Sequence, residues 1–401
     1  MIEICLKKKL NNGVRFVIGE NHTFPVASIA VIFEGGLRAE NENKNGIFNF
    51  LSRILEQNFT EKISKKIPEI NIKGFCRNDF WGICITTLSE KVKHILKLSK
   101  KELLNLDISR ERFESVKAGI IKEIKRWENI GLNIGLKNFN ELIYPKHPYG
   151  LPLKGTAETL NNILIADLME TFTSFAIPSN IVISIFGDIN TSQVEKIIEE
   201  EYGDLPQKGE IDIKFHSISK INTHKEKILF SPTYESIIIM GFLTCNISDP
   251  HRYTYEVIDR LIEQRLFENL RTKALSYHFG TKLTTNKEIG SYRIIVTTSY
   301  DNTAKCISLI FNIIDGFFSK KEIERAKKKV FFVEDVWLQS NFQNAIIAGV
   351  KEILGDNKKR QEYVQKIAPL QVYKIIKNFA YERSVLVKVT DHRNKEVSIV
   401  T

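Results

Sequence analysis

The sequence has few of the features that mark disulfide-bonded, secreted or membrane proteins. Its five cysteines are scattered, odd in number and without a Cys-x-x-Cys pair, which predicts reduced thiols in a cytoplasmic protein. No apolar run approaches the roughly 20 residues that a membrane-spanning helix requires. The first residues place the charges of Lys7, Lys8 and Lys9 after the apolar positions and offer no hydrophobic region of a signal peptide. We therefore expect a cytoplasmic protein with no membrane partner.

Nucleic-acid-binding motifs are also missing, although the formal net charge is +10. A positive charge of this size is compatible with an anionic partner. The basic residues are nevertheless spread along the chain in short runs, and no nucleic-acid motif accompanies them. The pattern favours a lysine-rich surface without a nucleic-acid partner. A weak preference for acidic peptides is the remaining alternative.

The composition is typical of a globular protein with full hydrophobic cores, with 43% apolar and 26% charged residues. A chain of 401 residues exceeds what one core usually serves, so two domains of about 200 residues each are expected. A polar stretch punctuated by glycine and proline supplies the boundary. We predict an N-terminal domain over 1–205, a linker over 206–226 and a C-terminal domain over 227–401.

The two halves repeat one order of helices and strands. A helix, a strand and a following aspartate are predicted over 165–188 and recur half a chain later over 370–391. Two related α+β domains, each an antiparallel β-sheet with helices packed on one face, explain this pattern economically. A chance match is the alternative.

Residues 46–56 are predicted to form a short helix with two faces. Apolar residues recur on one face at helical spacing. Asn49, Ser52 and Arg53 fall at i, i+3 and i+4 and share the other face. This spacing can present two metal ligands and a base to one point, but an amide, a hydroxyl and a guanidinium make a poor zinc site. By itself the pattern indicates an ordinary amphipathic helix with a polar face.

Short segments distributed along the chain together resemble a known family. They are Leu10-Asn-Asn-Gly13-Val-Arg, Gly36-Leu-Arg38-Ala-Glu40, Gly46 before the short helix, Lys122-Glu123-Ile124, His147-Pro148-Tyr149-Gly150 with Gly155-Thr156, Phe186-Gly187-Asp188, and Arg265-Leu266-Phe267-Glu268-Asn269-Leu270-Arg271 with Tyr277. Their order and spacing resemble the pitrilysin/insulinase family, which includes mitochondrial processing peptidases and two-domain bacterial peptidases. The resemblance covers nearly the whole chain and implies two homologous domains.

Active members of this family carry H-x-x-E-H on the first-domain helix. Two histidines bind zinc, the glutamate activates water, and a later glutamate is the third ligand. The resemblance aligns the motif with Asn49, Ser52 and Arg53, and the third ligand with Glu123, so this chain has neither imidazole nor base. Because a guanidinium cannot coordinate a metal and repels a dication, we expect Arg53 to pair with Glu123. The eight histidines include no His-x-x-x-His pair and no Cys/His cluster, so no relocated zinc site is expected.

The family also uses an arginine and a tyrosine near the start of the second domain to hold the substrate carbonyl and stabilise the oxyanion. Arg271 and Tyr277 resemble that pair. Their interval is one residue shorter than in the family, and Leu261-Ile262-Glu263-Gln264 replaces a glycine-rich turn. The other interpretation is a surface arginine and a half-buried tyrosine.

A chain that lacks the zinc ligands and has the Arg/Tyr pair resembles the non-catalytic subunit of a two-subunit family member. The resemblance implies a heterodimer in which a homologous partner binds zinc, while this chain binds none, donates Arg271 and Tyr277, and encloses unfolded peptides. The alternative is a structural or peptide-binding subunit without a catalytic part, as in core proteins of a respiratory complex. An independently active peptidase is the least supported interpretation.

Overall fold

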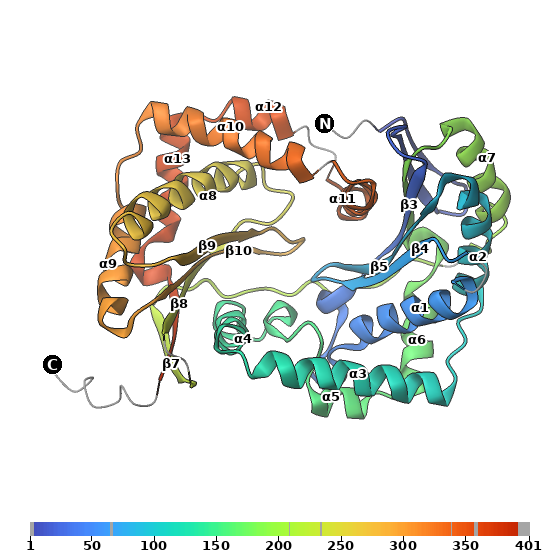
Figure 1. Ribbon diagram of the computed structural model, residues 1–401, viewed down its shortest axis with the longest axis horizontal. Helices are drawn as coiled ribbons and strands as arrows, with labels where there is room; N and C mark the ends of the chain where they lie inside the picture. Colours follow the sequence, from blue (N-terminus) through green and yellow to red (C-terminus); the bar gives the residue numbers. More distant parts are fainter. Residues whose placement is uncertain are drawn as a thin grey trace. The chain divides into compact units, whose positions relative to one another are not determined.

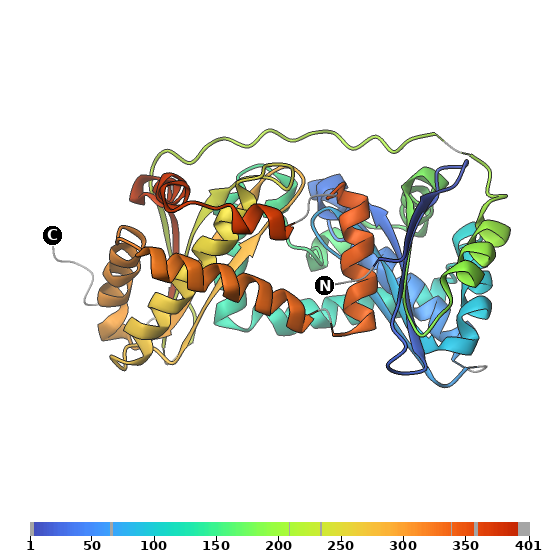
Figure 2. The same cartoon turned by 90° about the horizontal axis from the view of Figure 1, so that it is seen from above.

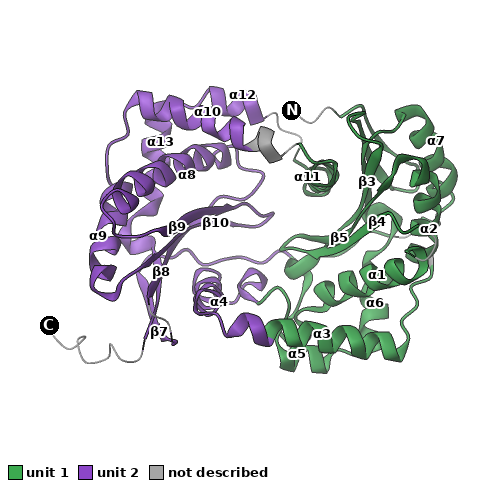
Figure 3. Cartoon of the chain, viewed as in Figure 1, with its two compact units in different colours: residues 1–124, 152–214, 334–357 green, residues 125–151, 215–333, 358–401 purple. Residues whose placement is uncertain are grey.

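The computed structural model describes residues 4–64, 67–207, 209–232, 235–337, 339–356 and 360–391. Its internal contacts divide the chain into two compact units, which Figure 3 colours separately. Unit 1 consists of residues 1–124, 152–214 and 334–357, and unit 2 of residues 125–151, 215–333 and 358–401.

The units differ from the predicted domains in how the chain is shared between them. The change from unit 1 to unit 2 after residue 214 falls inside the predicted linker, 206–226. Each unit also takes a segment from the other half of the sequence, 125–151 in unit 2 and 334–357 in unit 1. The two halves of the chain therefore exchange a helical segment.

Unit 1 is built on a six-stranded sheet with the strand order β1-β2-β6-β3-β5-β4. The strands are β1 (Leu6–Lys9), β2 (Arg15–Glu20), β3 (Val26–Glu34), β4 (Ile70–Cys76), β5 (Phe80–Leu88) and β6 (Ile181–Gly187). The helices that lie wholly or mostly in this unit are α1 (Ile47–Ile63), α2 (Val92–Leu104), α3 (Arg110–Glu128), α5 (Ala157–Asn162), α6 (Ile165–Phe175), α7 (Thr191–Tyr202) and α11 (Asn341–Leu354).

Strand β3 is apolar on both faces because helices cover the sheet on both sides. Ile29 and Val31 belong to the large core that includes residues of α1. Ala30 and Ile32 point to the opposite face and pack with Ala345 of α11. Figures 1 and 2 show α11 lying along the sheet near β3, and Figure 1 shows α1 on the other side. The prediction of helices on one face omitted this second layer.

Unit 2 repeats the arrangement around a five-stranded sheet with the order β7-β11-β8-β10-β9. Its strands are β7 (Lys225–Phe230), β8 (Ser236–Thr244), β9 (His278–Thr284), β10 (Gly290–Thr298) and β11 (Val385–Thr390). Its helices are α4 (Gly131–Ile143), α8 (Arg252–Leu266), α9 (Thr303–Ile314), α10 (Lys320–Trp337, which continues into the segment of unit 1), α12 (Arg360–Gln365) and α13 (Pro369–Ile376).

The order β7-β11-β8-β10-β9 matches β2-β6-β3-β5-β4 strand for strand, which confirms the internal repeat and the α+β class. Each sheet contains one parallel pair, β2 with β6 and β7 with β11, where only antiparallel pairing was predicted. The parallel pairs arise from the long connections that lead to β6 and β11. Strand β6 follows several helices and inserts between β2 and β3, so it runs parallel to β2 and antiparallel to β3.

The helices that the structure describes include no segment with the length and apolar character of a membrane span.

The exchanged helices approach their sheets closely at glycines. A Cβ atom at Gly349 of α11 would lie 2.6 Å from Ile32 Cδ1 and 3.0 Å from Ser184 Cβ. A Cβ atom at Gly135 of α4 would lie 2.7 Å from Ile239 Cδ1 and 2.9 Å from Val389 Cγ2. All four distances are shorter than ordinary carbon contacts, so the glycines set the depth at which each helix packs.

Gly349→Val is expected to lower the free energy of unfolding by about 2–3 kcal/mol, because the added methyl groups overpack the α11–sheet contact. Urea denaturation followed by circular dichroism measures the change. Gly119→Val is the matched control, since a Cβ atom at Gly119 of α3 meets no atom within 4 Å. Equal effects of the two substitutions would contradict the packing explanation.

Candidate functional site

The start of helix α1 is fixed by a buried carboxylate. Glu40 Oε2 accepts hydrogen bonds from the Gly46 backbone N–H at 2.7 Å and from Asn45 Nδ2 at 2.6 Å, and Oε1 accepts from the Phe48 N–H at 3.1 Å. Gly46 has φ +97, which favours glycine. Burial of Glu40 raises its pKa to about 7, against the lowering effect of these donors. These hydrogen bonds fix the start of α1 and therefore the positions of Asn49, Ser52 and Arg53 on it.

Two of the three positions aligned with H-x-x-E-H are buried and hydrogen-bonded locally. Ser52 is fully buried, and its Oγ donates to the Asn49 carbonyl oxygen at 2.8 Å. Asn49 is 9% exposed, and its Oδ1 has no hydrogen-bond partner in the part of the chain that is described. Neither side chain is a zinc ligand of the usual kind.

Arg53 and Glu123 form the ion pair that the sequence predicted. Arg53 Nη2 lies 2.7 Å from Glu123 Oε1, and Nη1 lies 3.3 Å from Glu56 Oε2. Lys154 Nζ lies 2.7 Å from Glu123 Oε2, so both oxygens of Glu123 meet a cation. Although burial alone would raise the pKa of Glu123, the hydrogen bond from Lys154 and the charge of Arg53 hold that pKa below its usual value.

The pair lies at the wall of an open groove of about 310 Å³ between α1 and α3. Other lining residues are Glu56, Gln57, Thr60, Val116, Gly119 and Ile120. The groove has two carboxylates, Glu56 and Glu123, and both are paired with cations. The two basic side chains therefore neutralise these carboxylates, and the guanidinium of Arg53 cannot coordinate a metal.

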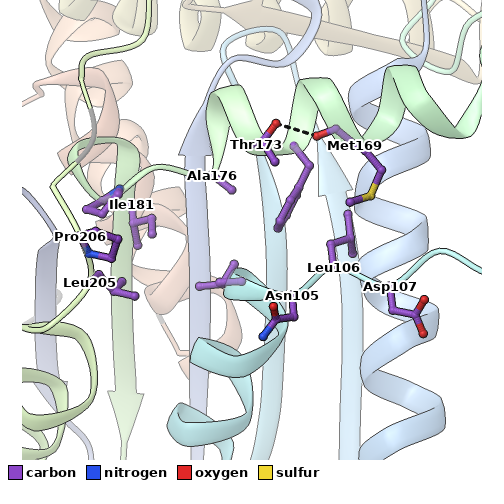
Figure 4. A pocket seen from close by; sticks show the side chains of 12 residues that line it. Asn105, Leu106, Asp107, Met169, Thr173, Ala176, Ile181, Leu205 and Pro206 are labelled. Atoms are coloured by element: carbon purple, nitrogen blue, oxygen red, sulfur yellow. Dashed lines mark hydrogen bonds between the residues drawn. The ribbon is translucent and has the colours of Figure 1, made fainter.

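Figure 4 shows a different cavity of unit 1, of about 350 Å³. Its lining comes from the end of α2, from α6 and from the chain after α7, and includes Leu106, Met169, Phe172 and Leu205. None of the predicted site residues lines it. This cavity is therefore separate from the Arg53–Glu123 pair.

Arg271 and Tyr277 lie in unit 2 on either side of a tight turn. Helix α8 continues as one π-helical turn, Phe267–Arg271, and its end is closed by the Leu275 and Ser276 backbone N–H groups, which donate to the Leu270 carbonyl at 2.9 and 3.3 Å. Ala274 adopts φ +52, a left-handed conformation that usually belongs to glycine. This turn connects the two residues across the shortened interval.

An aromatic contact links the two ends of that turn. The Arg271 guanidinium lies 5.5 Å from the centre of the Phe267 ring, within the range of a cation–π interaction. The Phe267 ring in turn lies 6.5 Å from that of Phe279 on β9, two residues beyond Tyr277. Arg271 is exposed, and Tyr277 is 70% exposed rather than half-buried. Both polar groups are accessible to a ligand.

The sequence analysis missed a buried cluster in unit 2. His147 Nε2 lies 2.8 Å from Glu288 Oε2, and His216 Nδ1 lies 3.4 Å from the same oxygen. His147 and Glu288 are almost completely buried. The three residues come from the loop after α4, the chain before β7 and the β9–β10 connection, so no spacing pattern in the sequence could have joined them.

The hydrogen bonding of His147 argues against a metal in this cluster. The Tyr149 backbone N–H donates to His147 Nδ1 at 3.1 Å, so the ring proton resides on Nε2 and points at Glu288. A metal-binding histidine instead donates from its other ring nitrogen and offers a lone pair to the ion. Burial lowers the pKa of His147 despite the nearby Glu288 carboxylate, which favours the neutral ring. We interpret the cluster as a structural anchor between the exchanged segment and the rest of unit 2.

Comparison with known proteins agrees with this architecture. Residues 162–330 match the family described as peptidase M16 inactive domain. The chain is 23% identical over 382 residues to the "Uncharacterized zinc protease YmxG" of Bacillus subtilis, covering 91% of this chain and 92% of that protein. It is 25% identical over 198 residues to cytochrome b-c1 complex subunit 1 of Saccharomyces cerevisiae, covering 48% of this chain and 43% of that one.

The fold is also that of a solved relative. A crystal structure of a peptidase M16 inactive domain from Pseudomonas fluorescens superposes with a TM-score of 0.85 at 16% identity, covering 96% of this chain and 98% of that one. The strand order, the Arg53–Glu123 pair and the sequence matches agree with the resemblance found in the sequence. Together, the match of residues 162–330 to the peptidase M16 inactive domain and the similarity to these proteins confirm the resemblance to the pitrilysin/insulinase family.

Proposed function

We propose that this chain is the non-catalytic subunit of a heterodimeric zinc peptidase. In this proposal, a homologous partner binds the zinc ion, and this chain forms half of the peptide-binding chamber. Arg271 and Tyr277 contribute hydrogen bonds to the substrate carbonyl as negative charge develops on its oxygen. Zinc is the cofactor of the partner and not of this chain.

The observation that carries the proposal is the ion-pair cluster of Glu123. Arg53 and Lys154 each lie 2.7 Å from one oxygen of this carboxylate. A zinc peptidase needs three protein ligands, an open position for water and a base. The positions aligned with two of the ligands and with the base carry an amide, a guanidinium and a hydroxyl, and only the third ligand is matched, by Glu123. This chain therefore needs a partner for metal-dependent hydrolysis.

The exposure of Arg271 and Tyr277 supports the second part of the proposal. A side chain that serves another subunit's site must reach outside its own core. The guanidinium is restrained by the Phe267 ring and not by an ion pair with a described residue. A cation that is positioned but not neutralised can hold a carbonyl oxygen in a transition state.

Co-expression with a homologue that carries an intact H-x-x-E-H tests the proposal by cleavage of a fluorogenic peptide. Combined Arg271→Ala and Tyr277→Phe substitution is expected to lower kcat by roughly 100-fold, the usual cost of losing an oxyanion donor. Lys273→Ala, an exposed neighbour in the same turn, serves as the control and should leave kcat unchanged. Equal cleavage by the homologue alone would disprove the heterodimer, and full activity of the double variant would disprove the residue assignment.

A structural or peptide-binding role without catalysis is the second candidate. The similarity of 48% of this chain to a subunit of the cytochrome b-c1 complex favours it. The same experiment separates the two. A stable complex that binds the peptide, with no dependence of kcat on Arg271 and Tyr277, would favour the structural role.

A further inference from the structure

Unit 2 contains a cavity of about 440 Å³ that the proposed function does not use. Its lining comes from the chain before β7, the end of β8, the start of α8 and the connection between α13 and β11. Five lining side chains are aliphatic, and we refer to them together as the aliphatic wall: Ile218, Ile221, Leu243, Ile289 and Ile375.

The segment that forms part of this wall is held in place. Ile221 is 5% exposed and belongs to the core that contains Phe139, Ile239 and Val387. His216, two residues before Ile218, lies against Glu288 of the buried cluster described above. The segment before β7 that lines the cavity is therefore fixed by buried contacts at both His216 and Ile221.

The lining also contains a connected set of polar groups. Arg383 Nη1 donates to Asn378 Oδ1 at 3.0 Å, and Asn378 Nδ2 donates to the Tyr255 hydroxyl oxygen at 3.1 Å. Thr244 is 5% exposed, and its Oγ1 has no hydrogen-bond partner among the residues that the structure describes. A buried hydroxyl left without a partner is costly, and a ligand that reached it would supply one.

Asp249 and Arg383, which carry opposite charges, line the same cavity as Tyr255. Burial raises the pKa of Tyr255 to about 12, and the charge of Asp249 acts in the same direction while Asn378 and the Arg383 guanidinium oppose it. The hydroxyl therefore keeps its proton and can donate it. Asp249 Oδ1 is occupied by the His251 N–H at 2.8 Å and the His251 ring at 2.9 Å. Among the residues that the structure describes, Asp249 Oδ2 accepts no hydrogen bond and the Arg383 guanidinium forms no ion pair.

We propose that this cavity binds a small zwitterion with an apolar side chain, either an apolar α-amino acid or a dipeptide of such residues. The ligand carboxylate lies at Arg383, the ammonium group at Asp249, and the side chain against the aliphatic wall. A cavity with mainly aliphatic walls and a few convergent polar groups is the usual form of a small-molecule site. The proposal does not depend on the proposed role in a heterodimeric peptidase.

Isothermal titration calorimetry of the full chain with four probes tests the charge assignment. L-leucine and L-leucyl-L-leucine carry both charges, L-leucinamide lacks the carboxylate, and N-acetyl-L-leucine lacks the ammonium group. At least one of the two zwitterions is expected to bind with a Kd below about 1 mM. The capped forms are expected to bind roughly tenfold more weakly than L-leucine, because each loses one charge-assisted contact. Comparing L-leucine with the dipeptide identifies which size the cavity accepts. If only the dipeptide binds measurably, its C-terminal amide and its N-acetyl form take the place of L-leucinamide and N-acetyl-L-leucine as probes.

Two single substitutions test which residue binds the carboxylate of the ligand and which binds its ammonium group. Arg383→Gln should abolish the preference for the zwitterion over the amide, and Asp249→Asn should abolish the preference over the N-acetyl form. Arg110→Gln, an exposed position of unit 1, is the matched control and should change neither ratio. The proposal is wrong if no zwitterion binds, if the capped forms bind equally well, or if the two substitutions leave both preferences intact.

Discussion

Replacing Asn49 and Arg53 together with histidine is expected to produce a chain that retains about one equivalent of zinc, whereas the natural chain retains none. The two positions lie one turn apart on α1. Arg53 already reaches the carboxylate at 2.7 Å. Two imidazoles and Glu123 then supply three protein ligands, with a fourth position for water. Elemental analysis after gel filtration in micromolar zinc measures the content.

Three further variants make that test specific. Arg53→His alone should retain little zinc, because it adds one imidazole only. Glu123→Ala in the double variant should remove the metal, and Lys154→Ala in the double variant should tighten its binding because Lys154 Nζ lies 2.7 Å from Glu123 Oε2. Stoichiometric zinc in the natural chain that disappears with Glu123→Ala would show that our interpretation of the Arg53–Glu123 pair is wrong.

The second large effect concerns the buried carboxylate at the start of α1. Glu40 has a pKa of about 7 in the folded chain against an ordinary value of 4.5, chiefly because of burial. The folded state therefore holds a proton that the unfolded state loses between those values. Stability that depends on this group is present below about pH 4.5 and is lost as the pH rises through about 7. The size of the loss is about 3 kcal/mol.

Urea denaturation of the natural chain and of Glu40→Gln at several pH values isolates this contribution. The difference between their free energies of unfolding should fall by about 3 kcal/mol from acid to neutral pH, since glutamine does not titrate. Glu123→Gln is the opposite control. The pKa of Glu123 is lowered, so the corresponding difference should rise with pH. If the difference in free energy of unfolding between the natural chain and Glu40→Gln does not change with pH, the three hydrogen-bond donors cancel the effect of burial on the pKa of Glu40.

The sequence predicted the parts of the site that depend on local spacing. The i, i+3, i+4 pattern placed Asn49, Ser52 and Arg53 on one face of a helix, and charge alone required a partner for a guanidinium at a former ligand position. Glu123 was found by family spacing, and the structure contains the pair. The repeat of helix, strand and aspartate likewise predicted two related units, because a period in the sequence is visible without knowledge of contacts.

Long-range packing was not visible in the same way. Helices α4 and α11 each carry an ordinary apolar stripe, and nothing in that stripe states which sheet it covers. The tertiary contacts, including those of Gly135 and Gly349, show that the two halves of the chain exchange these helices. The parallel pairing of β6 with β2 was hidden for the same reason, since it joins strands separated by most of the unit.

The sequence by itself therefore determined the fold class and the repeat, because the order of helices and strands recurs half a chain later. The replacement of the zinc ligands in α1 came from the helical spacing of Asn49, Ser52 and Arg53 together with the family resemblance. The tertiary structure alone decided which segments complete each unit, that Lys154 joins Arg53 at Glu123, and that His147, His216 and Glu288 meet in one buried cluster. It also showed that a π-helical turn and a left-handed Ala274 connect Arg271 to Tyr277. Those features depend on which distant surfaces fit together, and side-chain shape, not spacing, determines that fit.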